Sequence, residues 1–338
     1  AFPMIDLHTI LPELFICGAA FALLMADLFI DAKRRSLIHF LAITVLVAAV
    51  LITVRDLAIT TTTAFSGMFI RDLASDILKI SVYVVTALSF IYAKPYLIER
   101  GLYKSEYYVL CLFAVLGMML MISSGNLTVL YLGLELVALS SYGLVGLDRD
   151  NPIASEAAMK YFVLGAIASG LLLYGMSMLY GSTGSLQLDM IYLAATQTSS
   201  PYMFKLGVVF ILAGIAFKLG AAPFHMWLPD VYQGAPTAVT AFISSAPKLA
   251  AFAMAYRLLE SAAGVAASDW VPMLAVIATL SLLLGNLMAL VQSNFKRLLA
   301  YSTISHVGFL LLGMLTATPE GYAASMFYAI SYSIMAVA

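Results

Sequence analysis

Charged residues are scarce in this sequence. Asp, Glu, Lys and Arg make up only 10% of its 338 residues, whereas hydrophobic residues make up 63%. A typical soluble domain contains about a quarter charged residues. The mean hydropathy is +0.99, and the net charge is −1. The scarcity of charge excludes an ordinary water-facing surface, and the lack of a basic excess gives no indication of nucleic-acid binding.

Residues that bind redox groups are also few. The two cysteines, Cys17 and Cys111, both lie in apolar segments, which argues against a disulfide framework or a cysteine-based metal site. The sequence has no Gly-rich dinucleotide motif, no Walker loop and no cysteine ladder for an iron–sulfur cluster. We therefore expect no cofactor and no metal in this chain.

Long apolar runs are abundant. Runs of roughly 18 to 24 residues recur between short polar breaks, and each is long enough for a helix to cross a bilayer. The eleven runs lie near residues 10–30, 36–54, 73–92, 107–123, 127–147, 157–180, 203–222, 237–259, 271–292, 298–316 and 321–338. They lack the alternation of a barrel strand, and open sheets cannot cross lipid. The sequence therefore predicts an all-α, polytopic transmembrane helix bundle.

Basic residues in the breaks orient this bundle. If Lys33, Arg34 and Arg35 are cytoplasmic, nine basic residues of the breaks fall on that side and four on the other. By the positive-inside rule, this count predicts an N-terminus outside the cytoplasm. The break at residues 222–236, which contains His225, then lies on the cytoplasmic side.

Several ionisable residues lie inside or beside the apolar runs. From the rise of a helix, Glu135 lies about 12 Å into its run, Lys248 about 16 Å and His306 about 12 Å. Lys218 lies closer to the cytoplasmic end, where a local unwinding of its helix would move it inward. Ionisable groups at membrane depth are costly and usually functional. These four residues, with His225 at a helix mouth, predict a path for protons.

Structural explanations remain open for each of them. Lysines near a helix end commonly extend to the interface, which we expect for Lys79, Lys160 and Lys205. The same explanation is an alternative for Lys218 and Lys248. A buried Glu–Lys pair can also be purely structural. The histidine in the tenth run can equally be a core residue, and the one in the cytoplasmic break an interfacial anchor.

The longest motif surrounds Lys218 and reads FKLGAAPFHMWLPDVYQGAPT from Phe217 to Thr237. Further motifs are EAAMKYF at 156–162, SAPKLAAF at 245–252 and RLLAYSTISH at 297–306. With these motifs, the chain resembles the antiporter-like subunits of proton-translocating NADH:quinone oxidoreductase (respiratory complex I). That family is related to the large subunits of multi-subunit sodium/proton antiporters. Leu134 separates this chain from two branches of the family, which usually carry Trp before the glutamate.

The resemblance implies a fourteen-helix fold, of which this chain holds about eleven helices, with two inverted five-helix repeats and broken helices. Residues 1–106 then form three N-terminal transmembrane helices, residues 107–260 the first antiporter-like repeat, and residues 261–338 the start of the second, incomplete repeat. The sequence also contains one internal match, which pairs Ser140 with Ser305 and Gly143 with Gly308. The segments that begin at Asn126 and Asn294 overlay with an offset of 165 residues, or 168 at the leading Asn.

The resemblance also implies roles for single residues. Glu135 matches the glutamate of the family's fifth helix, and Lys218 matches the lysine of its broken seventh helix. Lys248 corresponds to the connecting lysine of the eighth helix, and His306 to a central-axis residue of the tenth. The family's twelfth-helix lysine, which serves the second half-channel, lies beyond the end of this sequence.

The function implied is proton translocation by a membrane-arm subunit in the bacterial plasma (inner) membrane. NADH, FMN, iron–sulfur clusters and quinone belong to the whole complex, and the expected partners are its other membrane subunits, including sister antiporter-like subunits, and the lipid bilayer. A nearby carboxylate favours a charged lysine and desolvation favours a neutral one. Movement of Glu135 relative to Lys218 would therefore load or release a proton. The alternatives are a subunit of a multi-subunit cation (Na+)/proton antiporter and a structural membrane scaffold.

Overall fold

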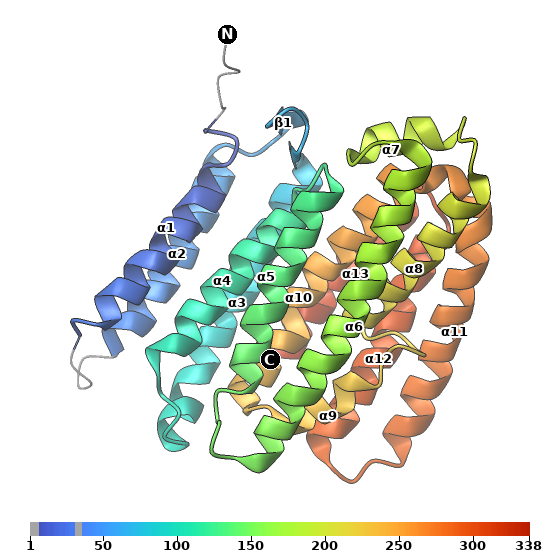
Figure 1. Cartoon of the computed structure of the whole chain (residues 1–338). Coiled ribbons are helices and arrows are strands. Elements are labelled where there is room, and N and C mark those ends of the chain that lie inside the picture. Colours follow the sequence, from blue (N-terminus) through green and yellow to red (C-terminus); the bar gives the residue numbers. More distant parts are fainter. Residues whose placement is uncertain (1–6, 31–35) are drawn as a thin grey trace. The chain divides into compact units, whose positions relative to one another are not determined.

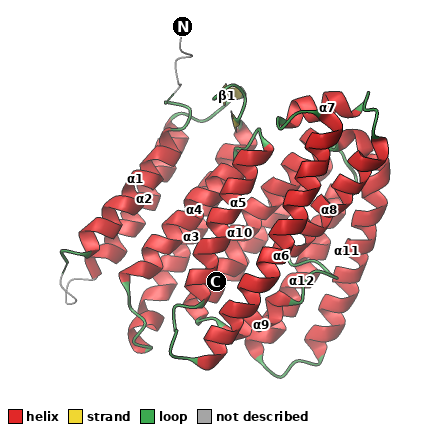
Figure 2. Ribbon diagram, in the orientation of Figure 1, coloured by secondary structure: helices red, strands yellow, loops and turns green. Residues whose placement is uncertain are grey.

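Long helices build almost all of this molecule (Figure 2). The computed structural model describes residues 7–30 and 36–338, so the basic triplet at 33–35 lies outside the described residues. The helices are α1 (Leu11–Asp27), α2 (Ser36–Arg55), α3 (Leu73–Glu99), α4 (Ser105–Ile122), α5 (Leu127–Val145), α6 (Pro152–Thr183), α7 (Leu188–Ala195), α8 (Pro201–Leu219), α9 (Trp227–Gly234), α10 (Thr237–Tyr256), α11 (Ala267–Leu290), α12 (Phe295–Met314) and α13 (Pro319–Val337). A π-helical turn (Arg257–Ala262) and a 3-10 turn (Gly264–Ala266) follow α10.

Each of the eleven predicted apolar runs forms a helix. Nine helices within the described ranges are long and apolar enough to cross a membrane, namely α2 to α6, α8 and α10 to α12. Helix α1 has 17 residues, which is the lower limit of the range of about 17 to 25 for a span, and α13 occupies the last predicted run. The predicted all-α membrane bundle is thus confirmed.

Four small elements in the polar breaks were not predicted. Strands β1 (Thr62–Ala64) and β2 (Phe69–Arg71) form an antiparallel hairpin between α2 and α3. The short helices α7 and α9 flank α8 in the chain. These segments are too short to show a hydrophobic period, so the sequence pattern does not distinguish them from loops.

The chain divides into two compact units. The first unit comprises residues 1–151, 236–250 and 333–338, and the second comprises residues 152–235 and 251–332. In the first unit α4 packs on α5 and α1, and α2 packs on α3 (Figure 1). In the second unit α6 packs on α8, α11 packs on α12, and α9 contacts α6 and α12. The predicted boundaries after residues 106 and 260 separate repeats of the sequence and not compact units of the structure. These boundaries therefore stay a prediction.

Polar side chains in the breaks set where several helices begin. Asp72 caps α3, and its side chain accepts a hydrogen bond from Ser75 N while the Ser75 side chain accepts one from Asp72 N. Asn126 caps α5 and Asn294 caps α12, each through its side-chain oxygen. Such caps satisfy backbone donors that a helix leaves unpaired in its first turn. The two asparagines that begin the overlaid segments therefore play the same structural role.

Candidate functional site

Lys218 lies at a helix break. Helix α8 ends one residue after it because Gly220 adopts a left-handed conformation, with φ of +82°. The backbone N–H groups of Gly220 and Ala221 both donate to the carbonyl of Ala216, at 2.9 and 2.7 Å, and this pattern closes the helix. The chain then turns and resumes a helix at Trp227. The predicted broken helix is present.

Neighbouring helices of the second unit hold this break in place. The Trp227 indole Nε1 donates to the carbonyl oxygen of Phe217 at 3.0 Å. The Trp227 ring also stacks on Tyr161 of α6, with ring centroids 4.7 Å apart. On the other side, Ala222 N donates to the Ser281 hydroxyl of α11 at 2.8 Å. Backbone groups freed by the break are therefore satisfied by side chains, which keeps an irregular segment stable among apolar helices.

Lys218 and His225 lie on the two sides of this break. The Lys218 side chain is half-buried, and its Nζ lies 5.9 Å from the centroid of the Phe217 ring. His225 is also half-buried in the α8–α9 connection. Burial lowers the pKa of His225, and a hydrogen bond to the backbone of Pro223 only partly offsets this effect. The neutral imidazole is therefore the favoured form near pH 7, and it can accept or donate a proton.

Lys248 is buried in α10, with only 3% of its surface exposed. This burial contradicts the alternative in which Lys248 extends to the interface. Pro247 precedes it inside the helix. The hydroxyls of Ser244 and Ser245, one turn earlier, both donate to the carbonyl of Ala241, at 3.2 and 2.7 Å. Both serine hydroxyls therefore donate their hydrogens to a backbone carbonyl within α10.

Glu135 lies on α5 beside a close helix crossing. A Cβ atom added to Gly117 of α4 would lie 2.7 Å from the Gly133 carbonyl oxygen, and a Cβ on Gly133 would lie 2.7 Å from that of Gly117. Because only glycine permits this approach, the crossing fixes the turn of α5 that carries Glu135. Its Oε1 atom is buried and has no hydrogen-bond partner among the described residues.

His306 lies on α12 among tyrosines of α13. Its Nδ1 atom and the Tyr328 hydroxyl are 2.7 Å apart, and its ring centroid lies 4.8 Å from that of Tyr332. The Tyr332 hydroxyl donates to the Thr303 hydroxyl at 2.7 Å. This hydrogen bond is compatible with a core histidine, because it satisfies a ring nitrogen. It is equally compatible with a histidine in a proton path, because it permits proton exchange with the hydroxyl.

The five predicted site residues occupy four helices and one connection. Glu135 and Lys248 belong to the first unit, and Lys218, His225 and His306 belong to the second. Their roles in a proton path stay predictions. Within residues 7–30 and 36–338, no group of three or more His, Cys, Asp or Glu side chains is arranged to hold a metal ion.

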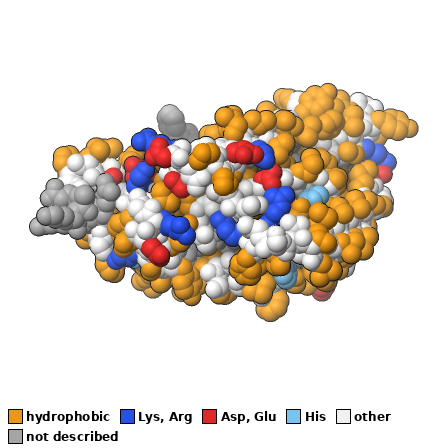
Figure 3. All heavy atoms as spheres, turned by 90° about the horizontal axis from the view of Figure 1, so that it is seen from below, with side chains coloured by type: hydrophobic (Ala, Val, Ile, Leu, Met, Phe, Trp, Pro, Cys, Tyr) orange, Lys and Arg blue, Asp and Glu red, His pale blue; other side chains and the backbone are white. Residues whose placement is uncertain are grey.

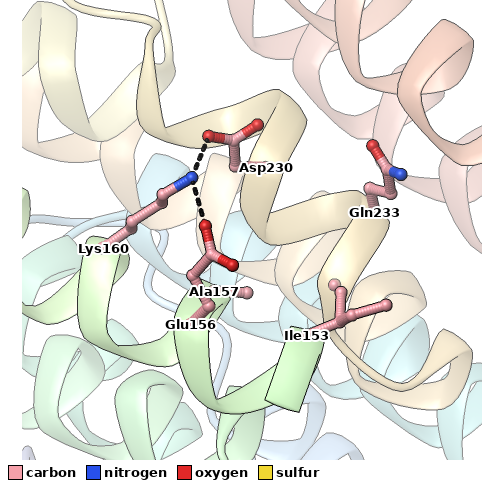
Figure 4. Close-up of a pocket in the computed structure, with 7 residues that line it drawn as sticks. Ile153, Glu156, Ala157, Lys160, Asp230 and Gln233 are labelled. Carbon is pink, nitrogen blue, oxygen red and sulfur yellow. Dashed lines mark hydrogen bonds and ion pairs between the residues drawn. The ribbon is translucent and has the colours of Figure 1, made fainter. Parts of the chain in front are cut away.

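A charged cluster on α6, α9 and α12 was not predicted. The Lys160 ammonium lies 2.8 Å from Glu156 and 3.0 Å from Asp230, as Figure 4 shows. Asp230 also receives a hydrogen bond from Arg297 at 2.6 Å. A cavity of about 270 Å³ lies beside it, lined in part by Gln233. Seen from the end of the molecule where α9 lies, this face carries Lys, Arg, Asp and Glu side chains (Figure 3).

The charges of this surface cluster stabilise one another. Burial alone would raise the pKa of Asp230, but hydrogen bonds and charge interactions with Arg297 and Lys160 outweigh it and lower that pKa below its usual value. The Lys160 side chain is 44% exposed, in agreement with the expectation that it extends toward water. Lys205, paired with Asp269 at 2.9 Å, is 51% exposed and also agrees.

The expectation for Lys79 was wrong. Its side chain is fully buried in the first unit, and its Nζ lies 2.6 Å from Oε1 of Glu13. The prediction failed because a residue near a helix end can also be covered by a neighbouring helix, here α1. A signal was present in the sequence, because Asp76, Lys79, Tyr83 and Thr86 follow the i, i+3, i+7, i+10 spacing of one helix face.

Comparisons with known proteins agree on one family. Residues 124–338 match the family described as "NADH:quinone oxidoreductase/Mrp antiporter, TM". The chain is 52% identical over 339 aligned residues to NADH-quinone oxidoreductase subunit N of Thioalkalivibrio sulfidiphilus, covering 99% of this chain and 70% of that one.

Solved structures share the fold. A chain of respiratory complex I from Thermus thermophilus superposes with a TM-score of 0.80 at 31% identity, over 96% of this chain and 68% of that one. A chain of the Mrp complex from Dietzia superposes with a TM-score of 0.84 at 22% identity, over 98% and 63%. The second likeness concerns the fold alone.

Proposed function

Because the chain belongs to the NADH:quinone oxidoreductase/Mrp antiporter transmembrane family, we propose that it is a proton-translocating membrane subunit of a bacterial NADH:quinone oxidoreductase. The observation that carries this proposal is the 52% identity to subunit N over 99% of the chain. In the assembly, NADH, FMN, iron–sulfur clusters and quinone are bound by other subunits. This chain contributes a proton path in the inner membrane and contacts sister antiporter-like subunits. It holds no redox centre of its own.

The path consists of Glu135, Lys218, Lys248, His306 and His225. The helix break supports a role for Lys218, because a lysine beside unwound backbone can change its surroundings without breaking a continuous helix. The burial of Lys248 supports a role in which the side chain alternates between charged and neutral forms, since burial favours the neutral form of an amine and a nearby negative charge favours the charged one. Glu135 supplies such a charge to the path.

The two alternatives differ from this proposal in what they require of the lysines. A stand-alone cation/proton antiporter uses the same lysines without a redox partner, and a structural scaffold needs only their fixed positive charge. The likeness to the Mrp complex, at 22% identity, bears on the fold and does not favour the antiporter. We also assign residues 1–106, 107–260 and 261–338 to the N-terminal helices, the first repeat and part of the second repeat.

The deciding experiment replaces Lys218 in the whole oxidoreductase. Lysine loses its proton readily when it is desolvated, whereas arginine stays charged in essentially every protein. We expect Lys218→Arg to assemble, and to take up protons into membrane vesicles with NADH as poorly as Lys218→Ala. Proton uptake is measured per assembled complex. Glu135→Gln should likewise assemble with reduced uptake, and Glu135→Asp should be milder.

Lys205→Arg on the same helix is the matched control. Lys205 is exposed and paired with Asp269, so its replacement by arginine should leave proton uptake unchanged. If Lys218→Arg takes up protons at the parental rate, Lys218 is a fixed structural cation and the scaffold alternative is the better account. If the assembled parent moves protons without oxidising NADH, the antiporter alternative replaces the proposal.

A further inference from the structure

Helix α3 carries a buried polar stripe that the proposed path does not use. Asp76, Lys79, Tyr83 and Thr86 lie on one face of this helix, and all four are fully buried. At the rise of an α-helix, the stripe extends over about 15 Å. Phe90, the next residue on the same face, packs on aromatic rings of α4 and ends the stripe. Four consecutive polar positions on a buried face are unusual, because each is costly unless it is satisfied or functional.

Glu13 of α1 faces this stripe. Its Oε1 atom lies 2.6 Å from Lys79 Nζ, and its side chain is 6% exposed. Neither group of this ion pair makes a hydrogen bond of ordinary geometry among the described residues, and the same holds for the Tyr83 and Thr86 hydroxyls. Polar groups in a purely structural buried pair are normally all hydrogen-bonded. Here the carboxylate keeps an oxygen available to bind a proton.

The β1–β2 hairpin covers the pair from one end of the helices. The Lys79 ammonium lies 5.0 Å from the centroid of the Phe69 ring, and Phe69 forms an apolar cluster with Ile10 and Ala64. The hairpin is fixed to the α4–α5 connection by the bonds from Ile70 N to Ser123 O and from Gly125 N to Met68 O, at 2.7 and 2.9 Å. The pair is therefore enclosed by an ordered cap.

A polar route leads from the surface toward the stripe beside this cap. Arg71 Nε donates to both carboxylate oxygens of Asp76, at 3.0 and 3.2 Å. Arg71 also donates to the carbonyl of Asp56 at 2.7 Å. The Asp56 carboxylate lies 3.4 Å from Nε2 of His8, and the exposed fractions of these side chains are 33% and 67%. Polar contacts thus continue from the exposed His8 to Asp76, one helical turn before Lys79. Arg71 stays charged, so it holds Asp76 in place and does not itself pass a proton.

We propose that Glu13 and Lys79 form a second proton-binding site of this chain, separate from the path through Glu135 and Lys218. The site takes up one proton on the Glu13 carboxylate from a hydronium ion, so that one O–H bond forms and water is left. The pair then carries one net positive charge, held by Lys79, until Glu13 releases the proton. Tyr83 and Thr86 extend the site inward, because a hydroxyl can both accept and donate a hydrogen bond.

This inference rests on the proposed function, since the proton is moved by the same complex. The test replaces both charges at once, with the double variant Glu13→Met and Lys79→Met. Replacing a buried ion pair by hydrophobic side chains of similar volume is often neutral or stabilising, so a structural pair predicts normal assembly and normal pumping. A proton-binding site predicts normal assembly and fewer protons taken up per NADH oxidised.

The control is the double variant Lys205→Met and Asp269→Asn, which neutralises an exposed ion pair of the same sign pattern and should leave the ratio unchanged. A parental proton-to-NADH ratio in the Glu13/Lys79 variant overturns the inference. If that variant does not assemble, Glu13→Gln decides, because the amide keeps the size of the side chain but cannot take up the proton. The inference requires a lowered ratio in Glu13→Gln and is overturned by a parental one. None of these outcomes depends on Lys218→Arg, which tests the proposed function alone.

Discussion

The two charged clusters of this chain differ in their contact with water. In the cluster of the first unit, the Lys79 and Glu13 side chains are 0% and 6% exposed, and those of Arg71 and Asp76 are 5% and 0% exposed. In the surface cluster of the second unit, Lys160 is 44% exposed. Short ion-pair distances occur in both clusters, so distance alone does not show which cluster loses more stability when a partner is removed. Burial does show it, because water replaces a lost partner only where water has access.

The largest effect should come from Lys79→Ala. This change leaves the Glu13 carboxylate buried without a counter-charge, and breaking a buried pair in this way costs about 3 to 5 kcal/mol. We expect little assembled subunit and a markedly lower Tm of the detergent-solubilised protein. A Tm equal to that of the parent would show that the surroundings of Glu13 are already hydrated, and the contrast between the clusters would fail.

A smaller loss should follow from Asp76→Asn. Arg71 loses a carboxylate that accepts two of its hydrogen bonds but keeps the carbonyl of Asp56. Hydrogen bonds to charged groups contribute about 1.5 to 3 kcal/mol each, and asparagine keeps one acceptor oxygen. We therefore expect a decrease in Tm between those of Lys79→Ala and the surface variant below. A decrease as large as that of Lys79→Ala would mean that Arg71 depends on Asp76 alone.

The smallest effect should come from Asp230→Asn in the surface cluster. Exposed ion pairs contribute less than about 1 kcal/mol and are screened by salt. The pKa of Asp230 is lowered in the folded protein, so its contribution is present above the ordinary carboxyl value of 3.8. It is lost as the pH falls through the lower folded value. The Tm difference between parent and variant should shrink in high salt and at acidic pH; a difference independent of both would contradict this account.

The eleven long helices were predictable from hydropathy, because the apolar run that identifies each of them is a continuous stretch of sequence. The eleven apolar runs are long enough to identify a span by composition alone. Where a boundary was wrong, a side chain explains it: the tenth run was placed from residue 298, whereas α12 begins at Phe295 because Asn294 caps it. The break beside Lys218 was also predictable, since Gly220 favours a left-handed conformation.

The spacing of the polar residues of α3 indicates that they share one helix face, but the partners of that face were not predictable by the same reasoning. Glu13 and Lys79 are 66 residues apart in the sequence, and only the packing of the first unit brings them into contact. The hairpin that covers them turns through Phe65 and Ser66, which have φ of +52° and +56°. Phe and Ser rarely adopt this left-handed conformation, so the sequence does not predict the turn. The depth of Glu135, Lys218 and Lys248 in their helices was predictable from the position of each residue in its apolar run and motif. The transfer of a proton between them depends on distances that only the tertiary structure sets.

The pairing of α1 with α3 has a consequence for how the protein is made. A charged residue that enters a membrane without a partner is costly, and Lys79 and Asp76 are both carried by the first two turns of α3. Their counter-charges are Glu13, which lies on α1, and Arg71, which directly precedes α3. Since α1 is synthesised first, Glu13 is already in place when Lys79 emerges from the ribosome. The first three helices therefore enter the bilayer most favourably as a set, and a chain without α1 must insert α3 with its lysine uncompensated.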